Sequence, residues 1–190
     1  MGILKQINWI DILILVFFLR IAFVSLKSGL PVEFFKLLGT ISAIYVAMQY
    51  YIKLALLLAD KTGIENLSLE IVKLICFIIL ASAGYLLFVL VRMLVCRFLK
   101  MEAVPELNMW GGFITGICRG ALLISLILFV LVLSNVKYLN KSVRNSYSAK
   151  TFFVLAPGTY KFLWRSVFSK IEPDSRLNKE VIAYEKGMCS

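Results

Sequence analysis

Four long apolar runs constrain the fold of this chain more than any other feature of its sequence. They cover approximately residues 9–26, 32–58, 71–94 and 112–136. Each run supplies the roughly 20 apolar residues that an α-helix needs to cross the hydrocarbon core of a bilayer. With 61% hydrophobic and 17% charged residues, the chain is far more apolar than soluble domains, which have about 45–50% and 25%. The sequence therefore predicts an all-α, polytopic membrane protein with four transmembrane helices and both termini on one side.

The composition changes after Val136, and we predict a division there into a four-span transmembrane domain (1–136) and a basic tail (137–190). Part of the tail repeats apolar residues at helical spacing. These residues are Tyr160, Leu163, Trp164, Val167, Phe168 and Ile171. The segment is too short to span a bilayer, so we predict an amphipathic interfacial helix on the membrane surface. From Glu172 onward we expect a solvated end.

Small residues recur at every fourth position in two of the apolar runs, which places them on one face of each helix. The fourth run carries Gly112, Gly116 and Gly120, and the second run carries Gly39, Ala43 and Ala47. A glycine inside a helix costs about 1 kcal/mol relative to alanine. In lipid, however, a stripe of small residues lets another helix approach closely. We predict that both stripes are helix-packing surfaces and that they are partners.

Charged residues within the runs predict a buried charge network of Asp11, Glu33 and Arg119, because an unpaired intramembrane charge is costly. Glu33 is the better partner for Arg119, since both approach the bilayer from the same side. Asp11 enters from the opposite side, at an axial separation from Arg119 of roughly 10 Å. Lys36, one turn after Glu33, is a local alternative partner, and Arg20 competes for the same carboxylate. Both a structural and a functional role for Arg119 remain open.

The chain carries 21 Lys and Arg against 11 Asp and Glu, and no histidine. The basic residues lie mainly at the ends of the runs and in the tail, a distribution that favours contact with anionic lipids over nucleic acid. Positive charge is divided between the two sides, so the sequence does not assign an orientation. Four scattered cysteines without histidine predict no metal site and no cofactor. Neither an activated nucleophile nor a catalytic carboxylate pair is evident, so we do not expect an enzyme.

Three short motifs resemble the colicin V production protein (CvpA) family over about residues 8–136. They are Asn8-Trp9-Ile10-Asp11, Gly29 followed by Glu33, and Gly112-x3-Gly116-x2-Arg119-Gly120. Ser28 and Asn108 depart from the family pattern, where arginine and an acidic residue are usual, and Arg20 is an added charge. The resemblance implies a multi-pass protein of the bacterial inner membrane. It also implies a non-enzymatic role linked to colicin V production or export and to envelope and biofilm processes.

Two classes of function remain open from the sequence. The first is a membrane accessory or scaffold protein whose small-residue stripes make helix contacts within the chain, in a homo-oligomer or with other membrane proteins. The second is a small channel or transporter subunit that acts as an oligomer, with Asp11, Glu33 and Arg119 lining an aqueous path. In both cases the lipid bilayer, with its anionic lipids, is an expected partner.

Overall fold

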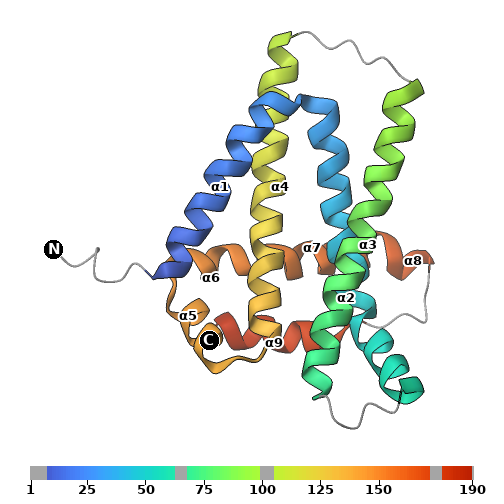
Figure 1. The fold of residues 1–190 in the computed structure, drawn as a ribbon, viewed down its shortest axis with the longest axis vertical. Coiled ribbons are helices and arrows are strands. Elements are labelled where there is room, and N and C mark those ends of the chain that lie inside the picture. The colour runs from blue at the N-terminus through green and yellow to red at the C-terminus, as the bar shows by residue number, and fades with distance from the viewer. Residues whose placement is uncertain (1–7, 63–67, 99–104, 172–176, 190) are drawn as a thin grey trace, which may run out of the picture.

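The protein is described by a computed structural model that covers residues 8–62, 68–98, 105–171 and 177–189. Throughout these ranges the chain forms helices and no strand. The four long helices are α1 (Trp9–Ser28), α2 (Leu30–Thr62), α3 (Leu69–Phe98) and α4 (Pro105–Leu133). The shorter elements are α5 (Lys137–Asn145), α6 (Tyr147–Phe153), α7 (Leu155–Leu163), the π-helix η1 (Trp164–Phe168), α8 (Ser169–Ile171) and α9 (Lys179–Cys189). Helices α1–α4 are long and apolar enough to cross a membrane (Figure 1), which confirms the predicted fold class.

The turn between α1 and α2 is a single residue, Gly29. Its φ of 76° lies in the left-handed region that glycine adopts without a steric cost. Pro31 stands in the first turn of α2, where its missing N–H leaves no hydrogen bond unmade. The side-chain oxygen of Asn108 on α4 accepts a hydrogen bond of 2.7 Å from the Leu30 N–H. Helix α4 therefore caps the start of α2 and is tied to the turn.

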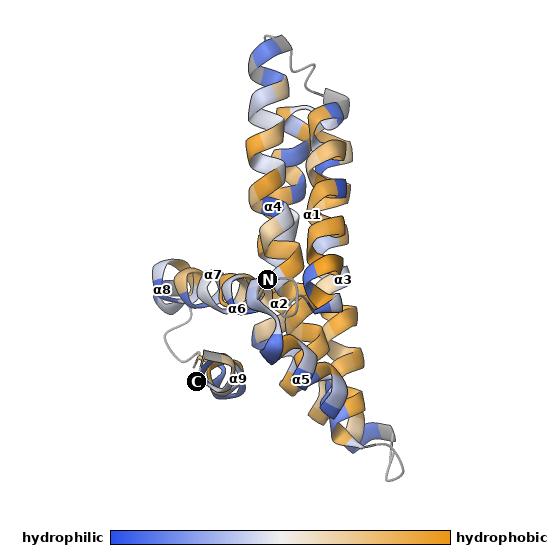
Figure 2. Ribbon diagram, turned by 90° about the vertical axis from the view of Figure 1, so that its left-hand side faces the viewer, coloured by the Kyte–Doolittle hydropathy of each residue, from blue (hydrophilic) through white to orange (hydrophobic). Residues whose placement is uncertain are grey.

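The long helices pack in the order α1, α4, α2, α3, so that α4 lies between α1 and α2 (Figure 1). The two outer helices, α1 and α3, expose many large apolar side chains. Figure 2 shows that hydrophobic residues dominate all four long helices over most of their length. Such surfaces are unfavourable in water and match the apolar interior of a bilayer.

The glycine stripe of α4 packs against α1. A Cβ atom on Gly112 would lie 2.9 Å from the carbonyl carbon of Gly29, and one on Gly116 would overlap the Ser25 side chain. A Cβ on Gly120 would lie 3.1 Å from Ile21. The two helices thus approach as closely as glycine allows, as in other small-residue contacts between membrane helices.

The stripe of α2 has a different partner, which corrects the expectation that the two stripes pack on each other. Gly39 meets the side chains of Tyr85 and Phe88 on α3, and the Ala43 backbone lies against Gly84 of α3. Ala47, one turn further along α2, is fully buried in the core. The physical reason is that α1 and α3 each supply small residues of their own at the contact.

Helices α6 and α7 run across the long helices and share their core (Figure 1). Phe153, Ala156 and Tyr160 are fully buried in the same cluster as Phe129 of α4. The Ser125 hydroxyl of α4 donates to the Phe153 carbonyl at 3.0 Å and accepts from the Ala156 N–H at 2.7 Å. Side chains on both sides of residue 136 therefore form one hydrophobic core.

The expected solvated end after Glu172 is wrong for residues 177–189. Helix α9 buries Val181 completely against this core. The Asn178 side-chain amide donates to the Met48 carbonyl of α2 at 2.7 Å, and Glu180 forms an ion pair with Lys73 of α3 at 2.7 Å. Apolar burial together with these polar contacts holds α9 on the bundle.

We predict that Gly116→Ala destabilises the protein by about 1–3 kcal/mol, because the added methyl group overlaps Ser25 and α1 must move away. Gly158→Ala in α7 is the matched control, since a Cβ there meets nothing within 4 Å. Alanine restricts the unfolded chain more than glycine does, so that variant should be as stable as the unchanged protein or slightly more stable. Thermal unfolding of the full chain in mild detergent measures both, and equal losses of stability would contradict the packing argument.

Candidate functional site

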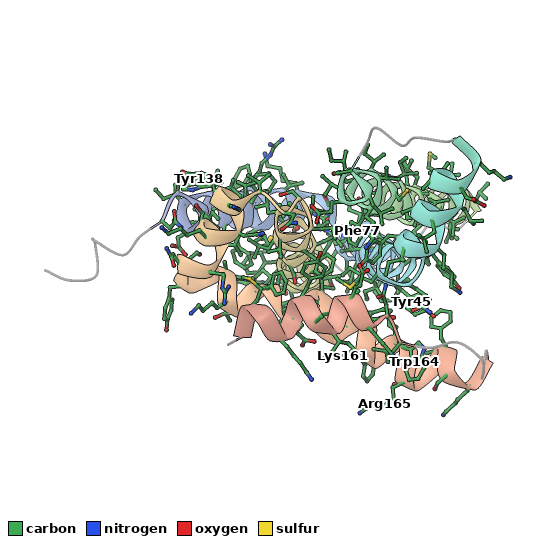
Figure 3. All side chains as sticks on the ribbon, turned by 90° about the horizontal axis from the view of Figure 1, so that it is seen from below. Tyr45, Phe77, Tyr138, Lys161, Trp164 and Arg165 are labelled. Atoms are coloured by element: carbon green, nitrogen blue, oxygen red, sulfur yellow. The ribbon has the colours of Figure 1, made fainter. Side chains whose placement is uncertain are left out.

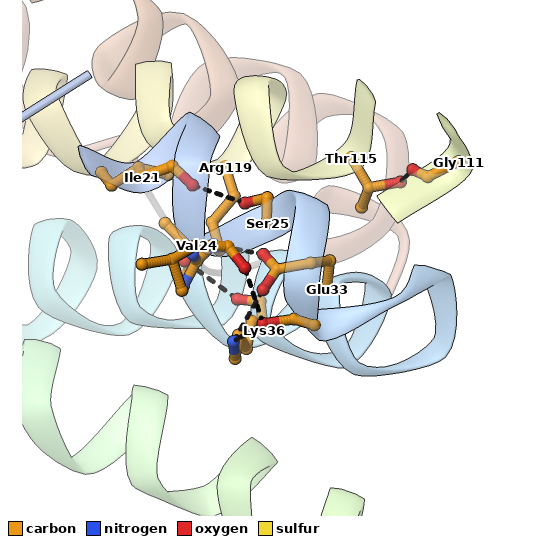
Figure 4. Close-up of polar contacts among 10 residues, drawn as sticks. Ile21, Val24, Ser25, Glu33, Lys36, Gly111, Thr115 and Arg119 are labelled. Atoms are coloured by element: carbon orange, nitrogen blue, oxygen red, sulfur yellow. Dashed lines mark hydrogen bonds and ion pairs between the residues drawn. The ribbon is translucent and has the colours of Figure 1, made fainter. Parts of the chain in front are cut away.

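Glu33, in the first turn of α2, is the centre of a buried group of charges. Its side chain is fully buried, yet both carboxylate oxygens face cations. Oε2 lies 3.0 Å from Nε of Arg119 on α4, and Oε1 accepts a hydrogen bond of 2.6 Å from Nζ of Lys36 (Figure 4). The structure thus brings together Glu33 and Arg119, and the local contact with Lys36 is present as well. We call Glu33, Lys36 and Arg119 the ion cluster.

The glycine stripe makes room for the ion cluster. A Cβ atom on Gly116 would lie 3.5 Å from Glu33 Oε2, so a longer side chain at this position would compete with the carboxylate for space. Arg119 lies almost one turn further along α4, and only 9% of its side chain is exposed. The close approach of α4 to α1 and the neutralisation of Arg119 therefore depend on the same glycine.

The ion cluster holds one carboxylate and two cations, which gives it a formal net charge of +1. Lys36 is the more exposed cation, with 16% of its side chain accessible, and its Nζ also donates to Ser28 Oγ at 3.3 Å. The desolvation cost of an uncompensated charge is lowest where water still reaches the group. Lys36, the more exposed cation, can therefore carry the extra positive charge of the cluster at the lower cost. The side chain at position 28 is a serine, so it adds a hydroxyl acceptor and no third cation to the cluster.

Asp11 does not belong to this cluster, which corrects the three-residue network. It lies in the first turn of α1, at the other end of that helix, and it contacts the helices that follow α4. Its Oδ1 accepts hydrogen bonds from Ser146 Oγ at 2.7 Å and from the Ser148 N–H at 3.0 Å. Its Oδ2 accepts from the Asn8 N–H at 3.0 Å. The hydroxyl and N–H groups at the start of α6 satisfy the carboxylate without a cation.

Two neighbours of Asp11 strengthen this second junction. The Asn8 side-chain amide donates to the Ser142 carbonyl at 2.6 Å, and the Trp9 indole N–H donates to Ser142 Oγ at 3.3 Å. The Asn8-Trp9-Ile10-Asp11 motif therefore fastens the start of α1 to α5 and α6. Arg20, between the two junctions, is exposed and forms no ion pair within the described part of the chain.

Residues predicted to face the membrane surface divide into two groups. Tyr160 is fully buried, accepts a hydrogen bond from the Asn178 N–H at 2.9 Å and donates to Gln49, so its placement at the lipid surface is wrong. Phe168 stacks on Tyr45 of α2 with ring centroids 3.7 Å apart. Both residues pack on the long helices because α2 offers aromatic and polar partners.

The other predicted surface residues lie further from the core. Leu163 and Trp164 are half-buried at the edge of the core, whereas Val167 is exposed. Figure 3 shows Arg165 on the outer side of this segment. The side chain of Ile171 lies outside the described part of the structure. A contribution of this segment to membrane contact stays a prediction.

Sequence reasoning missed the serines that complete these junctions. Ser25 stands four residues before Gly29, so the small-residue spacing of α1 could have identified it as the partner of the α4 stripe. Ser125, Ser142 and Ser146 lie in ordinary apolar or polar surroundings, and no pattern in the sequence distinguishes them.

Because Glu33 is the counter-charge of both Arg119 and Lys36, we predict that Glu33→Gln destabilises the protein more than Arg119→Gln does. The first change leaves the buried Arg119 and the half-buried Lys36 without a counter-charge, whereas the second leaves Glu33 paired with Lys36. A loss of about 3–5 kcal/mol is typical for an uncompensated buried charge. The double variant should lose less than the sum of the two single variants.

Thermal unfolding of the four proteins in mild detergent provides this comparison. Glu106→Gln, which removes an exposed carboxylate from the first turn of α4, is the control and should leave stability nearly unchanged. Strictly additive effects of Glu33→Gln and Arg119→Gln would show that the two side chains do not interact.

A family model described as "Colicin V production protein" matches residues 10–157 of the chain. The match extends past the last long helix, through α6 and into α7, and so includes Asp11 together with its partners Ser146 and Ser148. No curated protein and no solved structure matches the chain significantly. The family match covers more than half of the sequence, and the chain belongs to the colicin V production protein family.

Proposed function

We propose that this protein is a non-enzymatic accessory or scaffold protein of the bacterial inner membrane, which takes part in colicin V production or export and in envelope and biofilm processes. Membership of the colicin V production protein family supports the biological context. The four long apolar helices support a multi-pass location. The main support for a scaffold role is that Asp11, Glu33 and Arg119 in the long helices contact other helices of the same chain.

Every residue of the predicted charge network contacts another helix of the same chain. Glu33 and Arg119 join α2 to α4, and Asp11 joins α1 to α6. A residue that selects ions in a pore must exchange its partners with passing ions, whereas these side chains already contact charged or polar groups of the same chain. Their contacts support a role in fixing the arrangement of the helices.

The glycine stripe is also occupied within the chain. Gly112, Gly116 and Gly120 pack on α1, so this face is not available to line a pore between subunits. The alternative of a channel or transporter subunit that acts as an oligomer therefore loses one of the features on which it was based.

The exposed faces of α1 and α3 supply what a scaffold needs, namely surfaces for lipid, for a second copy or for other membrane proteins. Exposed apolar side chains on α1 include Ile12, Leu15, Val16, Leu19 and Phe23. Those on α3 include Ile75, Ile79, Leu86, Leu90 and Leu94. Because these helices are the two ends of the packing order, the protein can contact two neighbours at once.

The proposal is tested in a bacterial strain that produces colicin V and lacks its own member of the family. Expression of this chain should restore the amount of colicin V outside the cells, measured by growth inhibition of a sensitive strain. Gly116→Ala should restore less, while Gly158→Ala should match the unchanged protein, with membrane accumulation measured in parallel. Failure of the unchanged protein to restore export despite normal accumulation would contradict the proposed role.

Liposomes that contain the purified protein separate the scaffold from the channel. We expect their ion flux to equal that of protein-free liposomes over a range of protein densities. A protein-dependent flux that changes its ion selectivity in Arg119→Gln would favour the channel subunit instead. The mass of the protein in mild detergent, measured on the same sample, gives its oligomeric state.

A further inference from the structure

An open pocket of about 450 Å³ lies where the end of α4 meets α5 and α9. Its walls come from α4 (Val132), α5 (Asn140 and Arg144) and α9 (Glu180, Ala183, Tyr184, Gly187 and Met188). The volume is within the range of about 300–1,000 Å³ that is usual for small-molecule sites. Most of the lining is apolar, and a few polar groups stand at defined positions, as in other ligand sites.

Two polar groups of the pocket lack a partner within the described part of the chain. The Asn140 Oδ1 atom is buried and accepts no hydrogen bond there. A buried acceptor without a donor costs roughly 1–3 kcal/mol, and a rotation of the Asn140 amide toward the pocket would let a ligand hydroxyl or amine relieve this cost. Arg144 is exposed and forms no ion pair within the same residues, which favours an anion.

The other charged group of the pocket is already neutralised. Glu180 Oε1 lies 2.7 Å from Lys73 Nζ, and its Oε2 accepts a hydrogen bond of 3.1 Å from the Tyr51 hydroxyl. Burial, followed by the nearby Glu180 carboxylate, raises the pKa of Tyr184, so this phenol stays neutral beside a bound anion. The pocket therefore offers one unpaired cation, one unpaired acceptor and apolar walls.

Helix α5 also carries features of the membrane–water interface. Trp9 at the start of α1 and Tyr138 on α5 are both exposed and stack with ring centroids 6.5 Å apart. Figure 3 shows Tyr138 at the outer edge of the molecule. Aromatic residues of this kind gather at the level of the lipid headgroups. Lys137, Lys141 and Arg144 are exposed at positions that share one face of α5, where they attract phosphate.

We propose that this pocket binds a glycerophosphate group, an anionic phosphodiester or phosphate that carries free hydroxyl groups. Arg144 pairs with the phosphate oxygens, and a ligand hydroxyl donates to Asn140 Oδ1. The apolar part of the ligand lies against Val132, Ala183 and Met188. The group can come from the headgroup of phosphatidylglycerol or from a free glycerol phosphate. The site requires only the membrane location of the protein and is independent of its role in colicin V production.

Native mass spectrometry of the full chain in a neutral detergent tests this site. Phosphatidylglycerol and phosphatidylcholine with identical acyl chains are added separately, so that only the headgroup differs. We expect one phosphatidylglycerol molecule to be retained with at least about tenfold higher affinity than phosphatidylcholine, because choline replaces the glycerol hydroxyls with a cationic group that cannot donate a hydrogen bond to Asn140 and cancels the negative charge of the phosphate. Equal retention of the two lipids would overturn the proposal.

Substitutions of glycine test the pocket itself without changing its charge. A Cβ at Gly187 meets nothing within 4 Å, so Gly187→Leu adds a side chain that starts in open space at the wall of the pocket. Gly158→Leu is the matched control, since Gly158 is also open and does not line the pocket. We expect Gly187→Leu to abolish preferential retention and Gly158→Leu to preserve it. Equal affinities for phosphatidylglycerol in the two variants would overturn the site.

A second pair of variants tests the cation. Arg144→Gln should weaken phosphatidylglycerol binding about tenfold, whereas Arg165→Gln removes the same charge from an exposed position outside the pocket and should have no effect. Glycerol 3-phosphate is added as the soluble probe. If glycerol 3-phosphate displaces the lipid, the site binds free glycerol phosphate as well. If it does not, the site is specific for the lipid. If both arginine variants lost the same affinity for phosphatidylglycerol, the binding would depend only on the overall surface charge, and the proposal would be overturned.

Discussion

The close approach of α4 to α1 is the constraint on which the rest of the structure depends. Gly116 has no side chain where Ser25 lies, and Gly112 meets the backbone of Gly29 in the turn that starts α2. This turn fixes where Glu33 enters the bundle, and the same stretch of α4 presents Arg119 to it at 3.0 Å. If the two helices were separated by the width of a side chain, Arg119 would lose its counter-charge in apolar surroundings. The packing of small residues and the neutralisation of charge are therefore one interaction.

The two ends of α1 are fastened by different chemistry. At its end, α1 packs closely on α4, beside the ion cluster that joins α4 to α2. At its start, Asp11 accepts hydrogen bonds from Ser146 and Ser148. A carboxylate inside a membrane protein needs polar or charged partners in place of water. Near the end of α1, cations are the partners of Glu33, and at its start, hydroxyl and N–H groups are the partners of Asp11. Helix α1 has few other buried residues, so these two junctions determine its position.

The segment after α4 is part of the same core, and this changes what its basic residues can do. Phe153 and Tyr160 are fully buried against the long helices, and α9 is held by Asn178 and Glu180. Arg144 is therefore presented from a helix with a fixed position, next to a pocket of defined shape. A basic tail that lay loosely on the surface could attract anionic lipid only through its net charge. A fixed cation beside a buried acceptor can select one headgroup.

The sequence by itself determined the class of fold and the preferred partner of Arg119. Four runs of about 20 apolar residues can only be satisfied as membrane helices, because each helix completes its own backbone hydrogen bonds. The depth of Glu33 and Arg119 follows from the rise per residue, so their proximity could be predicted without knowing how the helices pack. The tertiary structure decided that the glycine stripe meets Ser25 and Gly29 of α1, that Asp11 joins α6, and that Tyr160 is buried. Each of these contacts depends on which helices are neighbours and how they are rotated, and periodicity along one helix contains no information about the helix beside it.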